Sequence, residues 1–235
     1  MPGFAVATFA SLAAGQYLVS IRSATLSFIY GDVFVSRRAS TGPGPPVFNP
    51  TRPLELRSGD QIETRVGVAE ILLGPGANVR LGGDTRIKLQ SADFADTRLN
   101  VIAGSAILEY AEYNPARRIS VIVGPVEAVL LAEGVYRFDA SADWVRVYLG
   151  RAQIARGGQT LVLKSGAQTR VRFGPLAAWT FRPDFDEPLF FWASNRSNEF
   201  AAANCNVGSA SHLGQRKCRQ FIGPFQRLTR PWRRP

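Results

Sequence analysis

The chain has 235 residues, of which 46% are apolar and 20% are charged. This composition allows one large domain with a packed core and argues against a disordered chain. The net charge of +10 is uneven, because seven basic residues and no acidic residue follow Glu199. The first 199 residues therefore carry only +3, so the folded part lacks the charge of a nucleic-acid-binding domain.

Residues 1–16 predict an atypical signal peptide. Residues 4–14 are apolar and rich in small side chains, and Ala13 and Ala14 suit a signal-peptidase site. No Lys or Arg precedes Arg22, so the usual basic start is missing. The alternatives are a chain start assigned too late and a buried first segment. The apolar run is shorter than the ~20 residues of a membrane-spanning helix. We expect a periplasmic, extracellular or cell-envelope protein.

Residues 25–173 predict an all-β domain. In segments such as 85–89 and 169–173, apolar side chains alternate with arginine or lysine. Successive side chains of a strand point to opposite faces, so each segment presents one buried and one wetted face. Glycines separate the segments as turn residues: Gly31, Gly59, Gly76, Gly104, Gly134, Gly150 and Gly166. We expect short antiparallel strands in a twisted β-solenoid-like or sandwich arrangement.

Residues 40–53 interrupt this pattern with five prolines. A segment with this many prolines cannot form a central strand, because proline donates no backbone hydrogen bond. We expect a stiff surface excursion between two strands; the alternative is a recognition loop.

Residues 174–204 predict a proline-rich linker followed by a short helix. Pro175, Pro183 and Pro188 break regular structure, and residues 189–204 suit a helix. Asp186, Glu187 and Pro188 are typical of a helix start. The helix aromatics, among them Phe190 and Trp192, are expected to pack against the β-domain.

Residues 205–235 form a basic tail with the two cysteines, Cys205 and Cys218. They could form a disulfide in an exported protein or remain free thiols. With His212 they fall short of a four-ligand zinc site. The tail is either a solvated end or a contact with a polyanion such as an anionic lipid, a wall polymer or nucleic acid. Its basic residues are Arg216, Lys217, Arg219, Arg227, Arg230, Arg233 and Arg234.

The sequence offers little for catalysis, so we expect neither an enzyme nor a bound cofactor or metal. His212 is the single histidine, and no nucleophile elbow, phosphate-binding loop or zinc-protease motif occurs. Clustered carboxylates could serve a glycosidase or bind calcium, but their places at turns and at a helix start favour turn and cap roles. These residues are Asp93, Asp96, Asp139, Asp143, Asp184, Asp186 and Glu187.

Aromatic and arginine side chains also occur together along the predicted strands. Such a face could stack sugars or bases, or it could simply cover the wet side of a sheet. The residues concerned are Tyr110, Tyr113, Tyr136, Trp144 and Tyr148, with Arg117, Arg118, Arg137 and Arg146.

Several phrases of residues 25–173 resemble the FecR domain of periplasmic regulators. The most specific is LRSGDQIET at 56–64, which is similar to the family phrase L-x-x-G-D-x-I-x-T. IYGDVFV at 29–35, AEILLGPGANVRL at 69–81, LNVIAGSAILE at 99–109 and VRVYLGRAQI at 145–154 follow in the family's order. Residues 163–168 are similar to the closing L-x-x-G-Q phrase with one insertion. At 133–139 the chain departs from the family's G-T-x-F-x-V, since it lacks the threonine.

The resemblance implies a stand-alone, exported, non-enzymatic FecR-domain protein that works in signalling through an envelope protein partner, a receptor or a regulator. The chain has no recognisable cytoplasmic anti-sigma segment before a spanning helix, so direct sigma-factor control is not expected. The alternative is a structural or polysaccharide-binding envelope protein that uses the basic tail and the aromatic and arginine face. The family-motif residues are expected to be structural: Gly31, Gly59, Asp60, Ile62, Thr64, Gly104, Gly150 and Gly166.

Overall fold

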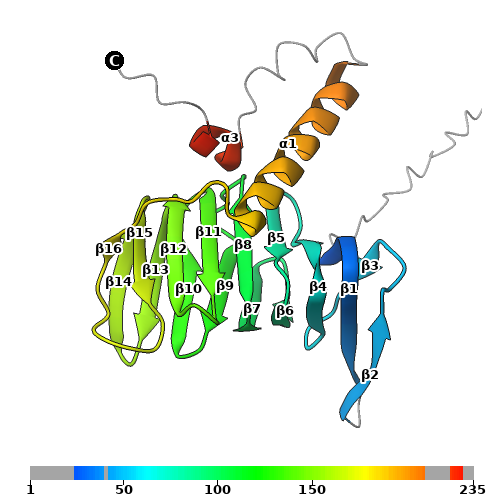
Figure 1. Ribbon diagram of the computed structural model, residues 1–235, viewed down its shortest axis with the longest axis horizontal. Helices are drawn as coiled ribbons and strands as arrows, with labels where there is room; N and C mark the ends of the chain where they lie inside the picture. The colour runs from blue at the N-terminus through cyan, green and yellow to red at the C-terminus, as the bar shows by residue number, and fades with distance from the viewer. Residues whose placement is uncertain (1–23, 40–41, 210–222, 230–235) are drawn as a thin grey trace, which may run out of the picture.

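The computed structural model describes residues 24–39, 42–209 and 223–229. Its sixteen strands belong to one hydrogen-bonded sheet that folds back on itself, which confirms the predicted all-β fold (Figure 1). The sheet bends back on itself at β4 (Gln61–Leu72). Residues 69–72 of this strand pair with β5, and residues 61–63 pair with β6. One long strand therefore belongs to both layers.

The first layer continues from β4 through six strands in the order β5 (Ala77–Leu81), β8 (Ser105–Tyr110), β11 (Gly134–Asp139), β12 (Trp144–Leu149), β15 (Ala167–Arg170) and β16 (Trp179–Thr180). The second layer continues through β6 (Arg86–Ala92), β7 (Asp96–Ala103), β9 (Arg118–Val123), β10 (Val126–Leu130), β13 (Arg151–Arg156) and β14 (Gln159–Lys164). Because β16 extends the sheet past residue 173, the β-domain is slightly longer than the sequence predicted.

The main core lies between the two layers and follows from the alternation in the sequence. In β7, Thr97, Leu99 and Val101 are buried while Arg98 faces solvent. Each buried Leu, Ile or Val contributes about 1.5–3 kcal/mol through removal of apolar surface from water. The inward residues of both layers form one buried cluster, so each layer covers the apolar face of the other.

The winding of the chain corrects one prediction. The chain moves repeatedly from one layer to the other, as in a solenoid, so β7 and β9 run side by side in the same direction. This pair is parallel, with Thr97 opposite Ile119, whereas the other pairs that the structure describes are antiparallel. The prediction of antiparallel strands is therefore wrong at this pair, because residues 104–117 take the chain through the first layer between them.

The proline-rich segment forms an arm at one end of the sheet. β1 (Thr25–Ala39) pairs with β4 along most of its length, and β2 (Gly42–Phe48) and β3 (Leu54–Glu55) pair with β1 alone. Figure 1 shows β1 and β2 projecting beyond the rest of the sheet. The prolines are thus accommodated at an edge, where a missing N–H costs no ladder hydrogen bond.

In the described residues, two helices follow the strands. α1 (Pro188–Ser209) begins at the predicted proline but continues five residues beyond the predicted end at 204. The short α3 (Pro224–Thr229) packs beside it on the outer face of the first layer (Figure 1). Neither described helix has the length and hydropathy needed to cross a membrane.

Candidate functional site

The family-motif residues at 59–64 hold a turn. The Asp60 carboxylate accepts a hydrogen bond from the backbone N–H of Arg57 at 2.9 Å, and the Asp60 backbone carbonyl accepts another from Leu89. Ile62 is fully buried in the core. The Thr64 hydroxyl donates to the carbonyl of Gly82 and accepts from the N–H of Thr85. These contacts tie the start of β4 to its neighbours.

Several of the motif glycines occupy places where a side chain would collide with neighbouring atoms. A Cβ on Gly31 would lie 2.1 Å from the carbonyl oxygen of Val66, and one on Gly104 would lie 2.3 Å from the Thr85 hydroxyl. Both have positive φ, as do Gly59, Gly150 and Gly166.

The clustered carboxylates hold turns or form ion pairs instead of facing a common cleft. Asp93 accepts from the N–H of Ala95, Asp143 from Arg172 and Asp184 from Asp186. Asp96 pairs with Arg98, whose hydrogen bond holds the pKa of the carboxylate below its ordinary value. Within the described residues, no group of three potential ligands is arranged to hold a metal ion.

The outer face of the first layer carries a row of residues in which sequence reasoning named Arg137 and Arg146 but missed the pairing of Glu70 with Arg80. Register places Glu70 opposite Arg80, Arg80 opposite Ile107, and Ile107 opposite Arg137. The row continues through Arg146 to Gln168 and Trp179. It therefore crosses the layer from β4 to β16.

The first charge cluster consists of Glu70, Arg80, Glu109 and Arg196. The fully buried Arg80 donates to Glu70 at 2.8 Å and to Glu109 at 2.9 Å. Arg196 of α1 reaches the other oxygen of Glu70 at 3.0 Å, and Ser197 donates to Glu109 at 2.8 Å. Two cations and two anions neutralise each other here, which is the condition for burying charge.

The second charge cluster consists of Arg137, Asp139, Arg146 and Glu187. Asp139 accepts from Arg137 at 2.9 Å and from Arg146 at 2.8 Å, and Arg137 also pairs with Glu187. Glu187 caps α1 as well, because it accepts from the N–H of Phe190 at 2.9 Å. Burial works to raise the pKa of Glu187, but the hydrogen bonds from Arg137 and Phe190 hold it below its ordinary value.

A small apolar cluster fills the space between the helices and the layer. Phe190 lies with its ring centroid 4.9 Å from Tyr148 and 5.3 Å from Phe225 of α3. Ile107 and Val135 complete the base of this cluster. Glu187 and Arg196 are nine residues apart, about 14 Å along a helix, and three strand spacings also span about 14 Å. α1 can therefore reach both charge clusters while it crosses the strands obliquely (Figure 1).

Much of the predicted aromatic and arginine face is covered. Tyr136 and Tyr148 are buried, and burial raises the pKa of both phenols. Trp144 is partly exposed beside Trp179, with Arg170 stacked 4.5 Å from its ring centroid. Tyr110 and Arg117 lie elsewhere, at the connection between β8 and β9. The residues thus do not form one open stacking platform, because α1 and Phe181 cover part of the face.

The arm carries exposed aromatic side chains. Tyr30 is 73% exposed and Phe48 is 53% exposed. One end of β1 pairs with β3 and the other with β2, and between them lies a gap without a neighbouring strand. Side chains bond to the β1 backbone in this gap. Arg52 donates to the carbonyl of Ile29, and Asn49 accepts from the N–H of Val33, both at 3.0 Å. An open groove follows this gap, lined by Ser27, Ile29, Tyr30, Gly31, Asn49, Pro50, Thr51, Arg52 and Pro53.

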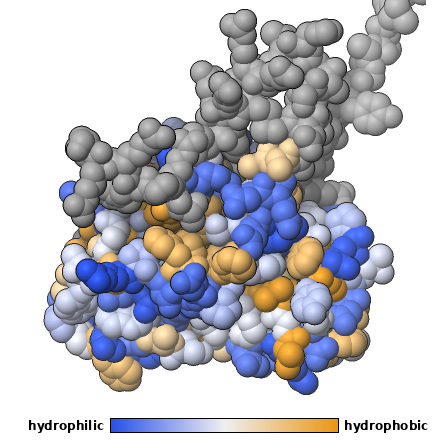
Figure 2. Space-filling view, turned by 45° about the horizontal axis from the view of Figure 1, so that its top comes forward, coloured by the Kyte–Doolittle hydropathy of each residue, from blue (hydrophilic) through white to orange (hydrophobic). Residues whose placement is uncertain are grey.

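The structure describes residues 205–209 of the tail as the end of α1, and residues 223–229, where Arg227 pairs with Glu133 at 2.7 Å. The predicted signal peptide, Cys218, His212 and the other basic tail residues lie outside the described residues, and the side chain of Cys205 is not described either. The disulfide and the polyanion contact stay predictions. Figure 2 shows hydrophobic and hydrophilic residues interleaved on the face from which the helices rise.

The sequence matches no family profile and no curated protein. Among solved structures, the chain is similar to two crystal structures of a "putative anti-sigma factor" from Parabacteroides distasonis. The sequence identities are 14% and 15%, and both TM-scores are 0.44. Each alignment covers 51% of this chain and 59% of the other, so the chain spans less than two thirds of the length of these proteins.

Proposed function

We propose that this chain is a non-enzymatic, FecR-like interaction module of the bacterial cell envelope, and that it serves signalling by binding a protein partner through the β1–β2 arm. The ordered FecR-like phrases between residues 29 and 168 support the family and the location. The geometry of the arm supports the mode of action.

The observation that carries the proposal is the combination of exposed aromatics and an incomplete strand edge on the arm. Tyr30 and Phe48 present apolar surface to solvent, and aromatic side chains of this kind are enriched at protein interfaces. The gap along β1 is bridged by the exposed Arg52 side chain, which an incoming extended segment can displace. Such a segment would then pair with β1 by strand addition.

The rest of the molecule suits a rigid scaffold. The charged groups under α1 form ion pairs with one another, and the clustered carboxylates accept hydrogen bonds in turns or form ion pairs. On the arm, the exposed aromatic side chains of Tyr30 and Phe48 lie on or beside a strand edge that is only partly paired.

The proposal is tested by photo-crosslinking in intact cells. A photoreactive phenylalanine analogue replaces Tyr30 or Phe48 in the full chain, and crosslinked products are purified and identified. We expect both positions to capture the same envelope receptor or sigma-regulatory membrane protein. Recovery of wall fragments alone would contradict a protein partner and support a structural, polymer-binding role.

The matched control is the same analogue at Phe173. Phe173 is 67% exposed, close to Tyr30 in accessibility, but it follows β15, next to the last strand of the first layer, whereas the arm pairs with β4. The product captured at Tyr30 should be absent at Phe173. Equal capture at both positions would show that exposure alone, and not the arm, decides the contact.

A further inference from the structure

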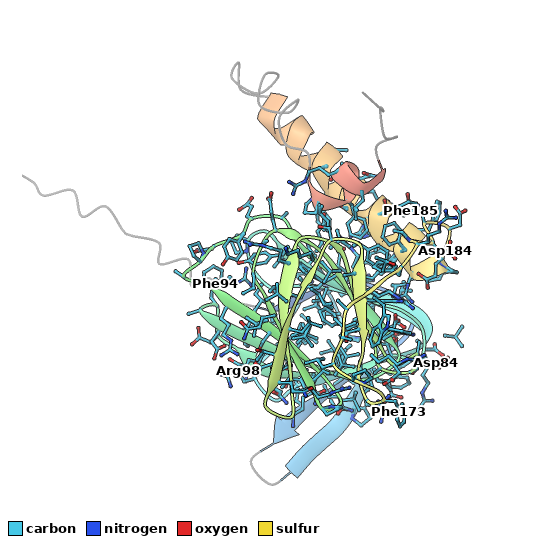
Figure 3. The ribbon with its side chains drawn as sticks, turned by 90° about the vertical axis from the view of Figure 1, so that its left-hand side faces the viewer. Asp84, Phe94, Arg98, Phe173, Asp184 and Phe185 are labelled. Atoms are coloured by element: carbon cyan, nitrogen blue, oxygen red, sulfur yellow. The ribbon has the colours of Figure 1, made fainter. Side chains whose placement is uncertain are left out.

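Three connections converge at one edge of the double layer and enclose a hollow. They are the turn 73–76 between β4 and β5, the turn 93–95 between β6 and β7, and residues 111–117 between β8 and β9. Figure 3 labels Phe94 on this flank. The hollow has a volume of about 310 Å³ and is lined by Pro75, Phe94, Glu112, Tyr113, Asn114, Pro115 and Arg117.

Arg117 is the buried group of this hollow, with only 3% of its surface exposed. Its Nη1 donates to the carbonyl of Pro75 at 3.1 Å and its Nη2 donates to that of Leu73. Its Nε is buried and has no partner. A guanidinium has five N–H donors, so these two bonds leave three unused.

The charge of Arg117 is not neutralised by the protein. No carboxylate in the described part of the chain forms an ion pair with it, in contrast to Arg80, which has two. The rings of Phe94 and Tyr110 lie 4.5 Å and 5.8 Å from its Cζ and offset part of the charge. Burial lowers the pKa of the guanidinium, as expected where desolvation is not compensated. A buried, unneutralised cation favours an anion beside it.

We propose that this hollow binds a small ring compound that carries a carboxylate. The carboxylate faces Arg117, and the ring lies against Phe94 and Tyr113, whose own ring is 42% exposed. A hollow of this size is at the small end of ligand sites and suits a compound of about one ring. Carboxylate and guanidinium match in shape, because two parallel N–H donors meet two oxygens.

The rim sets limits on the ligand. Glu112 is exposed at the edge of the hollow and repels a second negative charge on the ligand. The Oδ1 of Asn114 accepts from the N–H of Ala116 at 2.9 Å, which leaves the amide N–H₂ group to donate to a hydroxyl of the ligand. The site therefore favours a single carboxylate over a dianion such as phosphate.

The experiment is a calorimetric titration of the full chain with benzoate and with benzamide, its neutral counterpart of the same shape. We expect benzoate to bind at least about tenfold more tightly, since charged hydrogen bonds exceed neutral ones by this order. Equal affinity for the two compounds would overturn the proposal, because it would show that the carboxylate is not recognised.

Variants on the rim locate the binding without disturbing the turn that Arg117 holds. Glu112→Gln should tighten benzoate binding by about two- to threefold through loss of a like charge. Tyr113→Ala should weaken it several-fold. Unchanged affinity in both variants would place benzoate elsewhere and overturn the assignment.

Arg117→Met should abolish the preference for benzoate over benzamide, with the melting temperature measured alongside because the side chain also supports the turn 73–76. Arg118→Met is the control: Arg118 is exposed and pairs with Glu127 at 2.7 Å, so its loss should leave the preference intact. The site does not depend on the proposed function of the arm, since neither Tyr30 nor Phe48 lines the hollow.

Discussion

The surface beneath α1 buries charged side chains, whereas the β1–β2 arm exposes large apolar side chains. Beneath α1, Arg80 and Glu70 are fully buried and form an ion pair with each other, and Glu70 also pairs with Arg196 of the helix. On the arm, Tyr30 and Phe48 leave large apolar surfaces in water. The first arrangement fixes the position of a helix, whereas the second leaves apolar surface that a partner could cover. The contrast separates a structural region from a region proposed for recognition.

The largest expected effect comes from breaking the first charge cluster. Arg80→Met removes the cation between Glu70 and Glu109 and leaves two buried carboxylates facing each other. The free energy of unfolding should fall by about 3–5 kcal/mol, as for other broken buried pairs. Urea denaturation measures it. Arg118→Met breaks an exposed pair and should cost about 1 kcal/mol or less; similar losses in the two variants would contradict the distinction.

The apolar cluster should give the next effect. Phe190→Ala empties the space between Tyr148 and Phe225 and should cost about 3 kcal/mol, or expose α1 to protease if the helix detaches first. Its neighbour Phe191 is 57% exposed, and Phe191→Ala should change little. Denaturation and limited proteolysis of the two variants are compared. Equal sensitivity would show that α1 is not held by this cluster.

Acid should weaken the second charge cluster. The pKa of Glu187 is lower in the folded protein than its ordinary value of 4.5, so its contribution is complete above that value. The contribution is lost as the pH falls through the lower, folded pKa. Amide hydrogen exchange in the first turn of α1, followed from pH 6 to pH 3, should show faster opening at the acidic end. Glu187→Gln should open more readily at pH 6 and lose this part of the pH dependence.

The smallest effect on stability is expected on the arm. Tyr30→Ser should change the free energy of unfolding by less than about 0.5 kcal/mol, because the side chain is mostly in water. The same change should remove most of the crosslinked partner product formed through Phe48. A large loss of stability with unchanged partner capture would mean that Tyr30 serves the fold instead of recognition.

The sequence predicted the strands well because alternation and turn glycines are local signals. The Leu99 and Val101 face of β7, for example, depends only on the two-residue period. One further contact could have been found by counting outward from the turn at Pro75. Glu70 lies five residues before it and Arg80 five residues after it, so the two residues face each other in the hairpin.

The remaining features depend on contacts that are distant in the sequence. Arg196 meets Glu70 across 126 residues, and Arg117 meets Phe94 only because three turns end at the same edge. No local pattern encodes such meetings. The predicted aromatic and arginine face is divided because α1 packs over Tyr148 through Phe190. This contact is also distant in the sequence, so residue spacing does not predict it.

The alternation of the chain between the two layers has a consequence for biosynthesis. When a nascent chain has left the ribosome as far as β11, it contains strands of both layers. The first layer still lacks β12, β15 and β16, and the second still lacks β13 and β14. The core can therefore be completed only after β14 and β15 have emerged. The strands that end both layers are thus among the last parts of the domain to be synthesised.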